Sequence, residues 1–421
     1  MSFTRHKHWY FLIDCNQFFV SCEQAFNPKL MKAPTVVLSN NDGCVVSRSQ
    51  EAKNIGIPMG APLFQILDLV KRHNVNTLSS NFELYGDMSL RVMQTLSLFS
   101  PDIEEYSIDE AFLKITEDDP IILAKQIKNT VHKHTGIPVS VGIGQTKTLA
   151  KVASDIAKKE KDGVFLLSGD ADIELKKIPV IDIWGVGKNI AAGLKSYQIY
   201  TAFDLKNADD SYIRQKFSVV LLRTALELRG IECLSFDEIP KSKKSITCSK
   251  SFGRPVTEIK ELDEALSSYT SRATGRLRKD GSVAKVVHVF LTTSRFKEDF
   301  YYNYQILTLP FPSDYTPDII RCAKNALRKI FIEGYSYKKV GITLLDISPK
   351  HTPQSDFFDN VDKDTGKKNK VMMVIDSIKD KMGKNSIYFA SEGIQKDWEA
   401  KKELCSPKYT TRWDELLKIK I

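Results

Sequence analysis

The sequence predicts a multidomain protein of the α/β (α+β) class, in which strands and helices build the same domains. Three observations favour this class. The first 170 residues alternate short apolar runs with runs of helical periodicity, residues 171–235 turn helical, and a second α/β stretch follows a polar segment. The length of 421 residues and the 42% hydrophobic content are typical of a globular chain with two to four domains.

The first 170 residues are expected to place several strands in one sheet. The apolar run "WYFLID" (9–14) predicts a buried strand, and "NQFFVSCEQAF" (16–26) predicts a helix capped by Asn16. Further strands are predicted at 34–39, 43–47, 103–108, 110–115, 138–144 and 163–168. Further helices are predicted at 47–56, 120–136 and 146–159.

The helical stretch contains the sequence "IPVIDIWGVGKNIAAGLKSYQI" (178–199). Two short helices around "GVG" would form a helix–hairpin–helix, because glycines let backbone N–H groups approach a phosphate closely. A plain turn between two helices remains the alternative interpretation.

The polar, basic stretch 239–255 looks like a linker. A helix at 261–281 and strands at 283–294 and 338–348 predict a second α/β unit at about 245–348. The polar stretch 349–370 is expected to be flexible, and a helix is predicted at 371–383.

The composition excludes several classes of protein. No apolar run reaches the roughly 18 residues that span a bilayer, and the N-terminus lacks the cleavage site of a signal peptide, so we expect a cytoplasmic protein. The seven cysteines form no CxxC pair, which favours reduced thiols over disulfides or zinc. The pairs His6/His8 and His132/His134 are interpreted as surface histidines.

The positive charge is concentrated in one part of the chain. The formal net charge is +9, and residues 241–295 hold twelve Lys and Arg against five Asp and Glu. Such a stretch favours a polyanionic partner, nucleic acid first, although a solvated basic surface remains an equal alternative.

Three carboxylates are candidates for metal binding. Asp14 ends the first predicted strand, while Asp109 and Glu110 in "YSIDEAFL" lie between two later strands. Adjacent acids beside a core strand need compensation, most simply by a hard divalent cation with oxygen ligands. Such triples also occur by chance, so the acids alone are weak evidence.

Basic residues on two predicted helices complement these acids. Lys151 and Lys158 lie two helical turns apart, with Lys147 one turn before them, and Arg48 and Lys53 lie on another short helix. Because no GxxxxGK[ST] motif is present, cations and metal rather than a P-loop would hold a nucleoside triphosphate. The alternative for Lys151 is a solvated helix face.

Several motifs carry a family resemblance. They are "DCNQFFVSCE", "NNDGCVVSRSQEAKNIGIPMG", "YSIDEAFL", "VGIGQTKTLAKVASDIAKK" and "IPVIDIWGVGK". In this order and spacing the chain resembles Y-family translesion DNA polymerases over nearly its whole length. The tail "YFASEGIQKDWEAKKELCSPKYTTRWDELLKI" is similar to that of the UmuC-type branch, the catalytic subunits of bacterial DNA polymerase V.

The resemblance implies a right-hand polymerase with a ferredoxin-like palm, small fingers, a helical thumb with the helix–hairpin–helix, and an α/β little finger. The implied ranges are palm 1–30 and 81–170, fingers 31–80, thumb 171–238, linker 239–250, little finger 251–348, and flexible segment with UmuC-type C-terminal extension 349–421. The implied activity is low-fidelity, template-directed translesion synthesis in the SOS response by two-metal-ion nucleotidyl transfer.

The resemblance also implies roles for single residues. Asp14, Asp109 and Glu110 match the palm acids that bind two Mg²⁺ ions, with the backbone carbonyl of Cys15 as an additional ligand. Phe19 matches the steric gate, whose flat ring leaves no room for a ribose 2′-hydroxyl. Without the resemblance, helix core would be the favoured interpretation of Phe19, because the neighbouring Phe18 is equally apolar.

The fingers depart from the family pattern. Many relatives carry a Tyr-x-x-Arg pair on the triphosphate, where this chain has Gln50 and Lys53. Lysine keeps the charge but loses the bidentate fork, which Arg48 would compensate. The resemblance therefore implies nucleotide binding by Arg48, Lys53 and Lys158. A second acid of many relatives is Asn16 here, at a position that is not an essential ligand.

Implied partners are template–primer DNA, deoxynucleoside triphosphates, a processed UmuD dimer, RecA and the sliding clamp, with no membrane. The candidate DNA-binding residues are Gly185, Gly187, Lys188, Ser251, Arg254, Arg272, Arg276 and Lys279. Gln354, Phe357 and Phe358 in "QSDFF" resemble a clamp-binding peptide. The alternatives are a non-catalytic, DNA-bound accessory that recruits the clamp or recombination proteins, and a two-metal nuclease.

Overall fold

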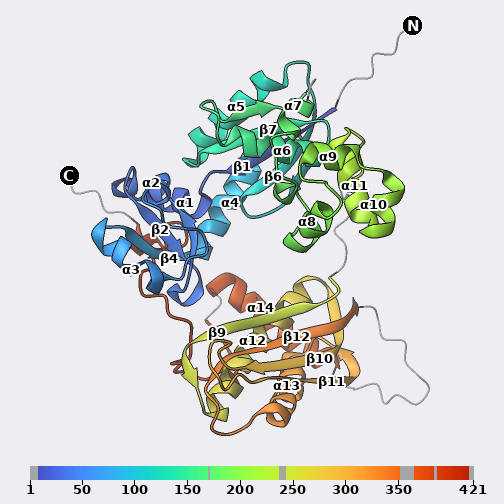
Figure 1. Cartoon of the computed structure of the whole chain (residues 1–421). Helices are drawn as coiled ribbons and strands as arrows, with labels where there is room; N and C mark the ends of the chain where they lie inside the picture. Colours follow the sequence, from blue (N-terminus) through green and yellow to red (C-terminus); the bar gives the residue numbers. More distant parts are fainter. Residues whose placement is uncertain (1–7, 169–170, 237–242, 351–364, 384–385, 417–421) are drawn as a thin grey trace, which may run out of the picture. The chain divides into compact units, whose positions relative to one another are not determined.

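The structure of the chain, a computed structural model, describes residues 8–168, 171–236, 243–350, 365–383 and 386–416 (Figure 1). The chain divides into two compact units. The first comprises Met1–Ser39, Gly43–Ile239 and Leu404–Ile421, and the second comprises Asn40–Asp42 and Pro240–Glu403. Within the described ranges, no helix is long and apolar enough to cross a membrane.

A five-stranded sheet forms the centre of the first unit, with the strand order β5-β6-β1-β7-β8. Its strands are β1 (His8–Cys15), β5 (Ile103–Glu105), β6 (Glu110–Thr116), β7 (Val139–Gly144) and β8 (Val164–Leu166). β1 lies between β6 and β7 and is antiparallel to both. The prediction that strands distant in the sequence share one sheet is confirmed.

Helices cover both faces of this sheet, so β1 is buried on both sides. Its residues Trp9, Phe11 and Ile13 pack in one core with α1 (Phe18–Phe26), α4 (Phe82–Leu96) and α5 (Pro120–Thr135). The alternate residues Tyr10 and Leu12 pack against α6 (Lys147–Ala157) on the opposite face. This alternation is the period of a β-strand, and it decides which helix each β1 side chain meets.

A second, three-stranded sheet has the order β3-β2-β4. Its strands are β2 (Thr35–Leu38), β3 (Val45–Arg48) and β4 (Asn76–Ser79). α2 (Gln50–Asn54) and α3 (Leu63–Arg72) pack on it. The turn η1 (Pro28–Leu30) follows α1, and the turn η2 (Asn40–Asp42) belongs to the second unit. β4 pairs only with β2 among the named strands, so it forms an edge of this sheet.

The helical stretch predicted after residue 170 is confirmed. It contains α7 (Ala171–Leu175), η3 (Val180–Asp182), α8 (Lys188–Lys195), α9 (Ala202–Asn207), α10 (Asp210–Lys216) and α11 (Val219–Leu228). The element before "GVG" is a single 3₁₀ turn rather than an α-helix. The buried Glu227 accepts hydrogen bonds from the backbone amides of Thr148 (3.0 Å) and Cys233 (2.8 Å), which ties α11 to the start of α6.

The second unit is a four-stranded sheet with two helices packed on one face. The sheet order is β11-β10-β12-β9, and its strands are β9 (Ile246–Val256), β10 (Ser282–Thr292), β11 (Tyr302–Ser313) and β12 (Tyr337–Pro349). The helices α12 (Ile259–Lys279) and α13 (Thr316–Ile330) pack on it, and α14 (Thr365–Met382) and η4 (Ala390–Glu392) follow. The turn η5 (Trp413–Glu415) belongs to the first unit.

The predicted cap of the first helix and one predicted helix start need correction. Gln17 rather than Asn16 is the N-cap residue of α1, and its side chain makes no cap hydrogen bond, because the chain turns through a left-handed residue there. The helix predicted at 47–56 begins only at Gln50, since Arg48 still pairs in β3, so Arg48 does not share a helix with Lys53.

Two boundaries outside these elements also differ from the prediction. β9 begins at Ile246, within the range 239–250 that was assigned to a linker. Ile246, Cys248 and Phe252 are buried while polar neighbours such as Thr247 are exposed, so an alternating strand was mistaken for a uniformly polar stretch. Similarly, α14 begins at Thr365, inside the range 349–370 that was expected to be flexible.

Candidate active site

Two carboxylates face each other where the central strands of the first unit end. The antiparallel register of β1 and β6 sets Asp14 opposite Glu110. Directly opposed residues place their side chains on the same face of a sheet. The backbone of Asp109 reaches the same strand end, because its carbonyl oxygen accepts a hydrogen bond of 2.8 Å from the Cys15 amide.

The helix α6 and the C-cap residue that follows it bring two lysines onto these acids. The Lys151 Nζ atom lies 2.9 Å from Glu110 Oε1 and 3.0 Å from Oε2. The Lys158 Nζ atom lies 2.7 Å from Asp14 Oδ2. Lys151 therefore belongs to the acid cluster, and the alternative in which it lines a solvated helix face is wrong. Lys147 is instead buried and binds Glu104 at 2.6 Å.

Burial and the paired lysines set the electrostatics of the cluster. Burial raises the pKa of Asp14 to about 7; the Lys158 ammonium opposes this rise and Glu110 adds to it. Burial lowers the pKa of Lys158, but the attraction of Asp14 outweighs it, so the pKa of Lys158 is raised and its ammonium stays charged at neutral pH. Asp14 and Glu110 are thus each paired with one lysine, and Asp109, on the turn before Glu110, adds a third carboxyl group near this strand end.

The cluster contains the type of ligand, carboxylate oxygen, that suits a hard divalent cation. Carboxylate oxygens are the ligands that Mg²⁺ prefers. Burial, together with repulsion by the three acids, raises the pKa of the Cys15 thiol, so this residue could offer only its backbone carbonyl oxygen. In the described ranges no three His, Cys, Asp or Glu side chains are arranged to hold an ion, and lysines occupy the carboxylates of Asp14 and Glu110.

A hydroxyl group shapes the turn that carries Asp109 and Glu110. The Ser107 Oγ atom donates to Asp109 Oδ1 (2.6 Å) and accepts from the amides of Asp109 (3.2 Å) and Glu110 (3.0 Å). Next to it, Lys151 lies over the Tyr106 ring at 4.6 Å. The Trp184 Nε1 atom donates to the Tyr106 hydroxyl at 3.0 Å. Trp184, which comes from the helical segment, was not among the predicted site residues.

Phe18 and Phe19, which the sequence could not distinguish, have different environments. Phe18 lies in the main core and is 3% exposed, whereas Phe19 is half-buried. The Phe19 ring is stacked on the Tyr85 ring, with 4.5 Å between ring centroids and 13° between planes. Gln17 before them has a left-handed φ of 50°, which turns the chain sharply from β1 into α1. Phe19 is therefore the member of the pair that a ligand could reach.

The predicted triphosphate-binding residues of the fingers lie on β3 and α2. Arg48 ends β3, and its guanidinium donates to the Ile57 carbonyl oxygen. Lys53 lies on α2 and is exposed, as is Gln50, which binds Asn54 within the same helix at 2.9 Å.

The predicted DNA-binding residues lie in both units. Gly185, Gly187 and Lys188 are exposed at the start of α8, and a side chain added at Gly187 would meet no atom within 4 Å. In the second unit, Arg254 pairs with Glu261 and Lys279 with Asp380 at 3.0 Å.

The remaining candidates of this unit lie on two elements. Ser251 is on β9, while Arg272 and the exposed Arg276 are on α12, where Arg272 lies 3.9 Å from Glu399. Gln354, Phe357 and Phe358 lie outside the described residues.

Glu23 and Tyr85, two residues near Phe19, were not among the predicted site residues. Glu23 follows Phe19 at the helical spacing i,i+4, so a buried acid on the same face of α1 could have been recognised. Tyr85 lies on α4, in a stretch for which no element was predicted, and the sequence carries no signal that places its ring under Phe19.

Comparison with known proteins places the chain in a family. Residues 13–155 match the model of the impB/mucB/samB family, residues 243–357 match its C-terminal domain, and residues 369–419 match a domain of unknown function, DUF4113. The chain is 43% identical to the protein UmuC of Salmonella typhimurium, covering 97% of this chain and 99% of UmuC. It is 27% identical to DNA polymerase IV of Moorella thermoacetica, covering 90% and 94% of the two chains.

Solved structures agree on the fold. A Y-family DNA polymerase chimera of Dbh and Dpo4 superposes with a TM-score of 0.64 at 21% identity, covering 81% of this chain and 99% of the chimera. An insertion ternary complex of Dbh DNA polymerase superposes with a TM-score of 0.54 over 81% of this chain and 99% of Dbh. The chain therefore belongs to the impB/mucB/samB family, within the UmuC-like branch of the Y-family translesion DNA polymerases that act in the response to DNA damage.

Proposed function

We propose that the chain performs low-fidelity, template-directed nucleotidyl transfer at the strand end that carries Asp14, Asp109 and Glu110, as part of the SOS response. The observation that carries the proposal is the β1–β6 register, which places Asp14 opposite Glu110. Lys158 and Lys151 form ion pairs with these two acids. Membership of the UmuC-like branch supports the reaction class.

The three carboxylates, with the carbonyl oxygen of Cys15, would hold two Mg²⁺ ions. When bound, such ions lower the pKa of an attacking hydroxyl and offset the charge of the leaving phosphate. The carboxylate oxygens and the opposition of Asp14 and Glu110 across β1 and β6 support this assignment.

The basic residues would hold the incoming deoxynucleoside triphosphate. Lys158 keeps its charge at neutral pH and lies at the acid cluster, so its ammonium can donate to phosphate oxygens. Arg48 and Lys53 would supply further positive charge from β3 and α2. Phe19, half-buried and backed by Tyr85, would lie under the sugar and exclude a 2′-hydroxyl.

Template–primer DNA would bind the exposed glycines at the start of α8 and the basic residues of the second unit. The residues proposed for these contacts are Gly185, Gly187, Lys188, Ser251, Arg254, Arg272, Arg276 and Lys279. Contacts to phosphate carry little information about the base sequence, which suits a polymerase that must copy DNA of any sequence. The UmuC-like branch supports a processed UmuD dimer, RecA and the sliding clamp as partners, the clamp through Gln354, Phe357 and Phe358.

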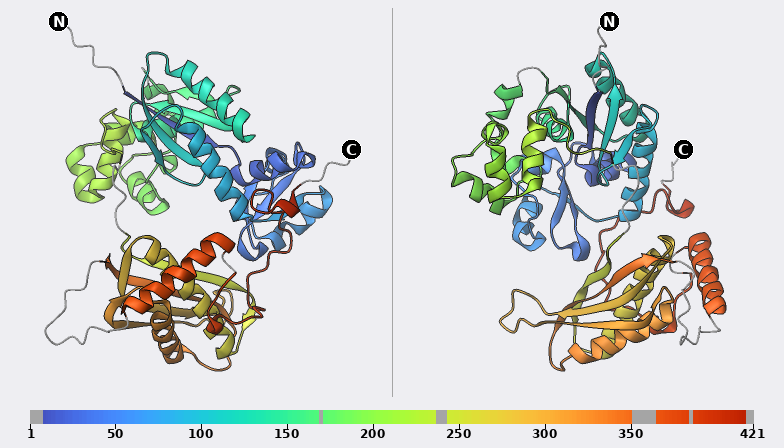
Figure 2. Two further views of the ribbon diagram at one scale, coloured as in Figure 1. Left: turned by 180° about the vertical axis from the view of Figure 1, so that it is seen from behind. Right: turned by 90° about the vertical axis from the view of Figure 1, so that its right-hand side faces the viewer.

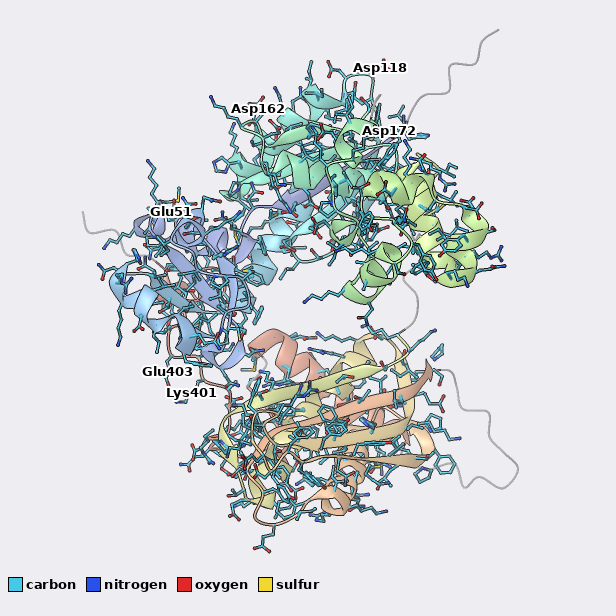
Figure 3. All side chains as sticks on the ribbon, in the orientation of Figure 1. Glu51, Asp118, Asp162, Asp172, Lys401 and Glu403 are labelled. Carbon is cyan, nitrogen blue, oxygen red and sulfur yellow. The ribbon has the colours of Figure 1, made fainter. Side chains whose placement is uncertain are left out.

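Primer extension past an abasic site, with Mg²⁺, deoxynucleotides and the purified partners, tests the proposal. Asp109→Ala is expected to lower extension by at least about 1,000-fold, because the site loses an acid that cannot be replaced by water. Asp118→Ala is the matched control, since Asp118 is an exposed acid away from the cluster (Figure 3). Full activity of Asp109→Ala would refute the mechanism, and degradation of the template without extension would favour a nuclease.

A further inference from the structure

The described end of the chain returns to the first unit and docks on the edge of its three-stranded sheet (Figure 2). Cys405 forms a parallel bridge with Ser79, the last residue of β4. The Ser79 amide donates to the Leu404 carbonyl oxygen at 2.9 Å, and the Leu404 amide donates to Ser79 Oγ at 3.0 Å. Backbone pairing at an exposed edge gives this segment a defined register.

The docked segment supplies a hydrogen bond to a buried acid. Glu23 of α1 is 1% exposed, and burial raises the pKa of its carboxyl group. Its Oε1 atom accepts hydrogen bonds from the Tyr85 hydroxyl at 2.8 Å and from Ser406 Oγ at 3.0 Å, and both donors oppose that rise. Asn81 holds Ser406 in turn, with 2.9 Å between Nδ2 and Oγ. A buried carboxylate without such donors would be costly, so the interaction orients all three side chains.

Tyr85, which donates to Glu23, also packs against Phe19, the proposed sugar gate. Tyr85 is fully buried and stacks on Phe19, so the position of Phe19 follows that of Tyr85. The segment is also fixed at its far end, where Tyr409 stacks on Phe26, the last residue of α1, at 5.0 Å between ring centroids. A continuous series of contacts thus joins residues 404–409 to Phe19.

We propose that the segment 404–409 is a positioning element for sugar selection, acting from Ser406 through Glu23 and Tyr85 on Phe19. The inference rests on the proposed role of Phe19 as the steric gate. A gate excludes one hydroxyl group, so a displacement of its ring by a fraction of an ångström admits the ribonucleotide while the deoxynucleotide still fits. The segment lies within residues 369–419, which match a domain of unknown function, and the proposal gives its last part a role.

The test measures kcat/KM for insertion of a deoxynucleotide and of the matching ribonucleotide by the full chain with its partners. Ser406→Ala is expected to lower the deoxy-to-ribo ratio by about three- to tenfold, mainly through faster ribonucleotide insertion. Tyr85→Phe, which keeps the ring and removes the hydrogen bond to Glu23, is expected to act in the same direction. Ser406→Thr keeps the hydroxyl and should restore the ratio. Ser97→Ala at the far end of α4 is the matched control.

The double variant separates the two proposals. If the segment acts through Phe19, Ser406→Ala adds nothing to the ratio once Phe19→Ala has removed the gate. A Phe19→Ala variant with unchanged sugar preference refutes the gate itself. If Phe19→Ala changes the deoxy-to-ribo ratio as expected, but Ser406→Ala and Tyr85→Phe both give the same ratio as Ser97→Ala, the positioning role alone is refuted. If Ser406→Ala does not fold, Tyr85→Phe decides the outcome.

Discussion

At Asp14, burial and the charge of Lys158 act on the pKa of the carboxyl group in opposite directions. Its pKa of about 7 in the folded chain exceeds the value of 3.8 expected for an unfolded chain, because burial outweighs the attraction of Lys158. The folded state therefore binds a proton more tightly at this site than the unfolded state does. The stability that this group contributes is present below about pH 4 and is lost as the pH rises through about 7.

We therefore expect the free energy of unfolding of the metal-free protein to fall between about pH 5 and about pH 8, and Asp14→Asn to reduce this fall. Urea unfolding at the two pH values measures it. Because Mg²⁺ would compensate the ionised carboxylate, added Mg²⁺ should stabilise the unsubstituted protein at the higher pH and have less effect on Asp14→Asn. If the free energy of unfolding falls with pH equally in Asp14→Asn and in the exposed control Asp118→Asn, the raised pKa is not that of Asp14.

The Phe19 ring, which stacks on Tyr85, would exclude a ribose 2′-hydroxyl if it acts as the proposed sugar gate. Phe19→Ala is expected to raise ribonucleotide insertion relative to deoxynucleotide insertion by about tenfold or more, because the space for a 2′-hydroxyl is opened. Single-nucleotide insertion kinetics with both sugars measure the ratio. Phe64→Ala serves as the control, since Phe64 is an exposed aromatic residue of α3. An unchanged ratio would reduce Phe19 to a packing residue of α1.

Among the elements, α6 determines where the lysines lie, and the glycines of β7 determine where α6 lies. A Cβ atom at Gly142 would come within 2.0 Å of the Ser154 amide nitrogen, and one at Gly144 within 2.6 Å of the Ala150 amide nitrogen. The helix thus lies directly on the strand, with no room for a methyl group. This close approach holds Lys151 within reach of Glu110.

Gly142→Ala is therefore expected to lower the free energy of unfolding by about 3 kcal/mol, because backbone cannot move aside as a flexible side chain can. It should also impair nucleotide insertion in the molecules that still fold, since α6 carries Lys151. Gly86→Ala on α4 is the matched control, as its added methyl meets no atom within 4 Å and helix propensity favours alanine. Denaturant titration measures the free energy of unfolding of both variants. If Gly142→Ala is as stable as Gly86→Ala, α6 can move away from β7 at little cost.

For the whole molecule, the C-terminal extension is part of the folded protein rather than an appendage. Trp398 is 1% exposed and packs edge-on against Phe252 and Tyr269 in the core of the second unit. The Gly253 amide donates to the Trp398 carbonyl oxygen at 3.2 Å. Residues 404–409 then pack with the first unit. One extension therefore contributes to both units.

Trp398→Ala is expected to destabilise the second unit by about 3–5 kcal/mol, since it leaves a large cavity in that core. Trp413→Ala removes the same atoms from a side chain that is 90% exposed, and it should change stability by less than about 0.5 kcal/mol. Thermal and denaturant unfolding of the two variants measures the difference. If both tryptophans prove equally dispensable, the extension is not integral to the core.

Sequence patterns identified much of the fold, with gaps that have physical reasons. The helix predicted at 261–281 is present as α12, and its residues Leu262, Leu266 and Leu277, which repeat at helical spacing, are buried because one side of that helix meets a core. β4 and α4 were not predicted. β4 is only four residues long and half-buried, so its pattern is too short for a periodicity to emerge.

The sequence by itself determined most elements of the first 170 residues, the strand ends that carry Asp14, Asp109 and Glu110, and the family, because periodicity and motif spacing are local properties of the chain. Only the tertiary structure decided the opposition of Asp14 and Glu110, the pairing of Lys151 and Lys158 with these acids, and the contact of Ser406 with Glu23. These contacts join residues that are far apart in the chain. Strand register and helix packing, which depend on the whole core, set them.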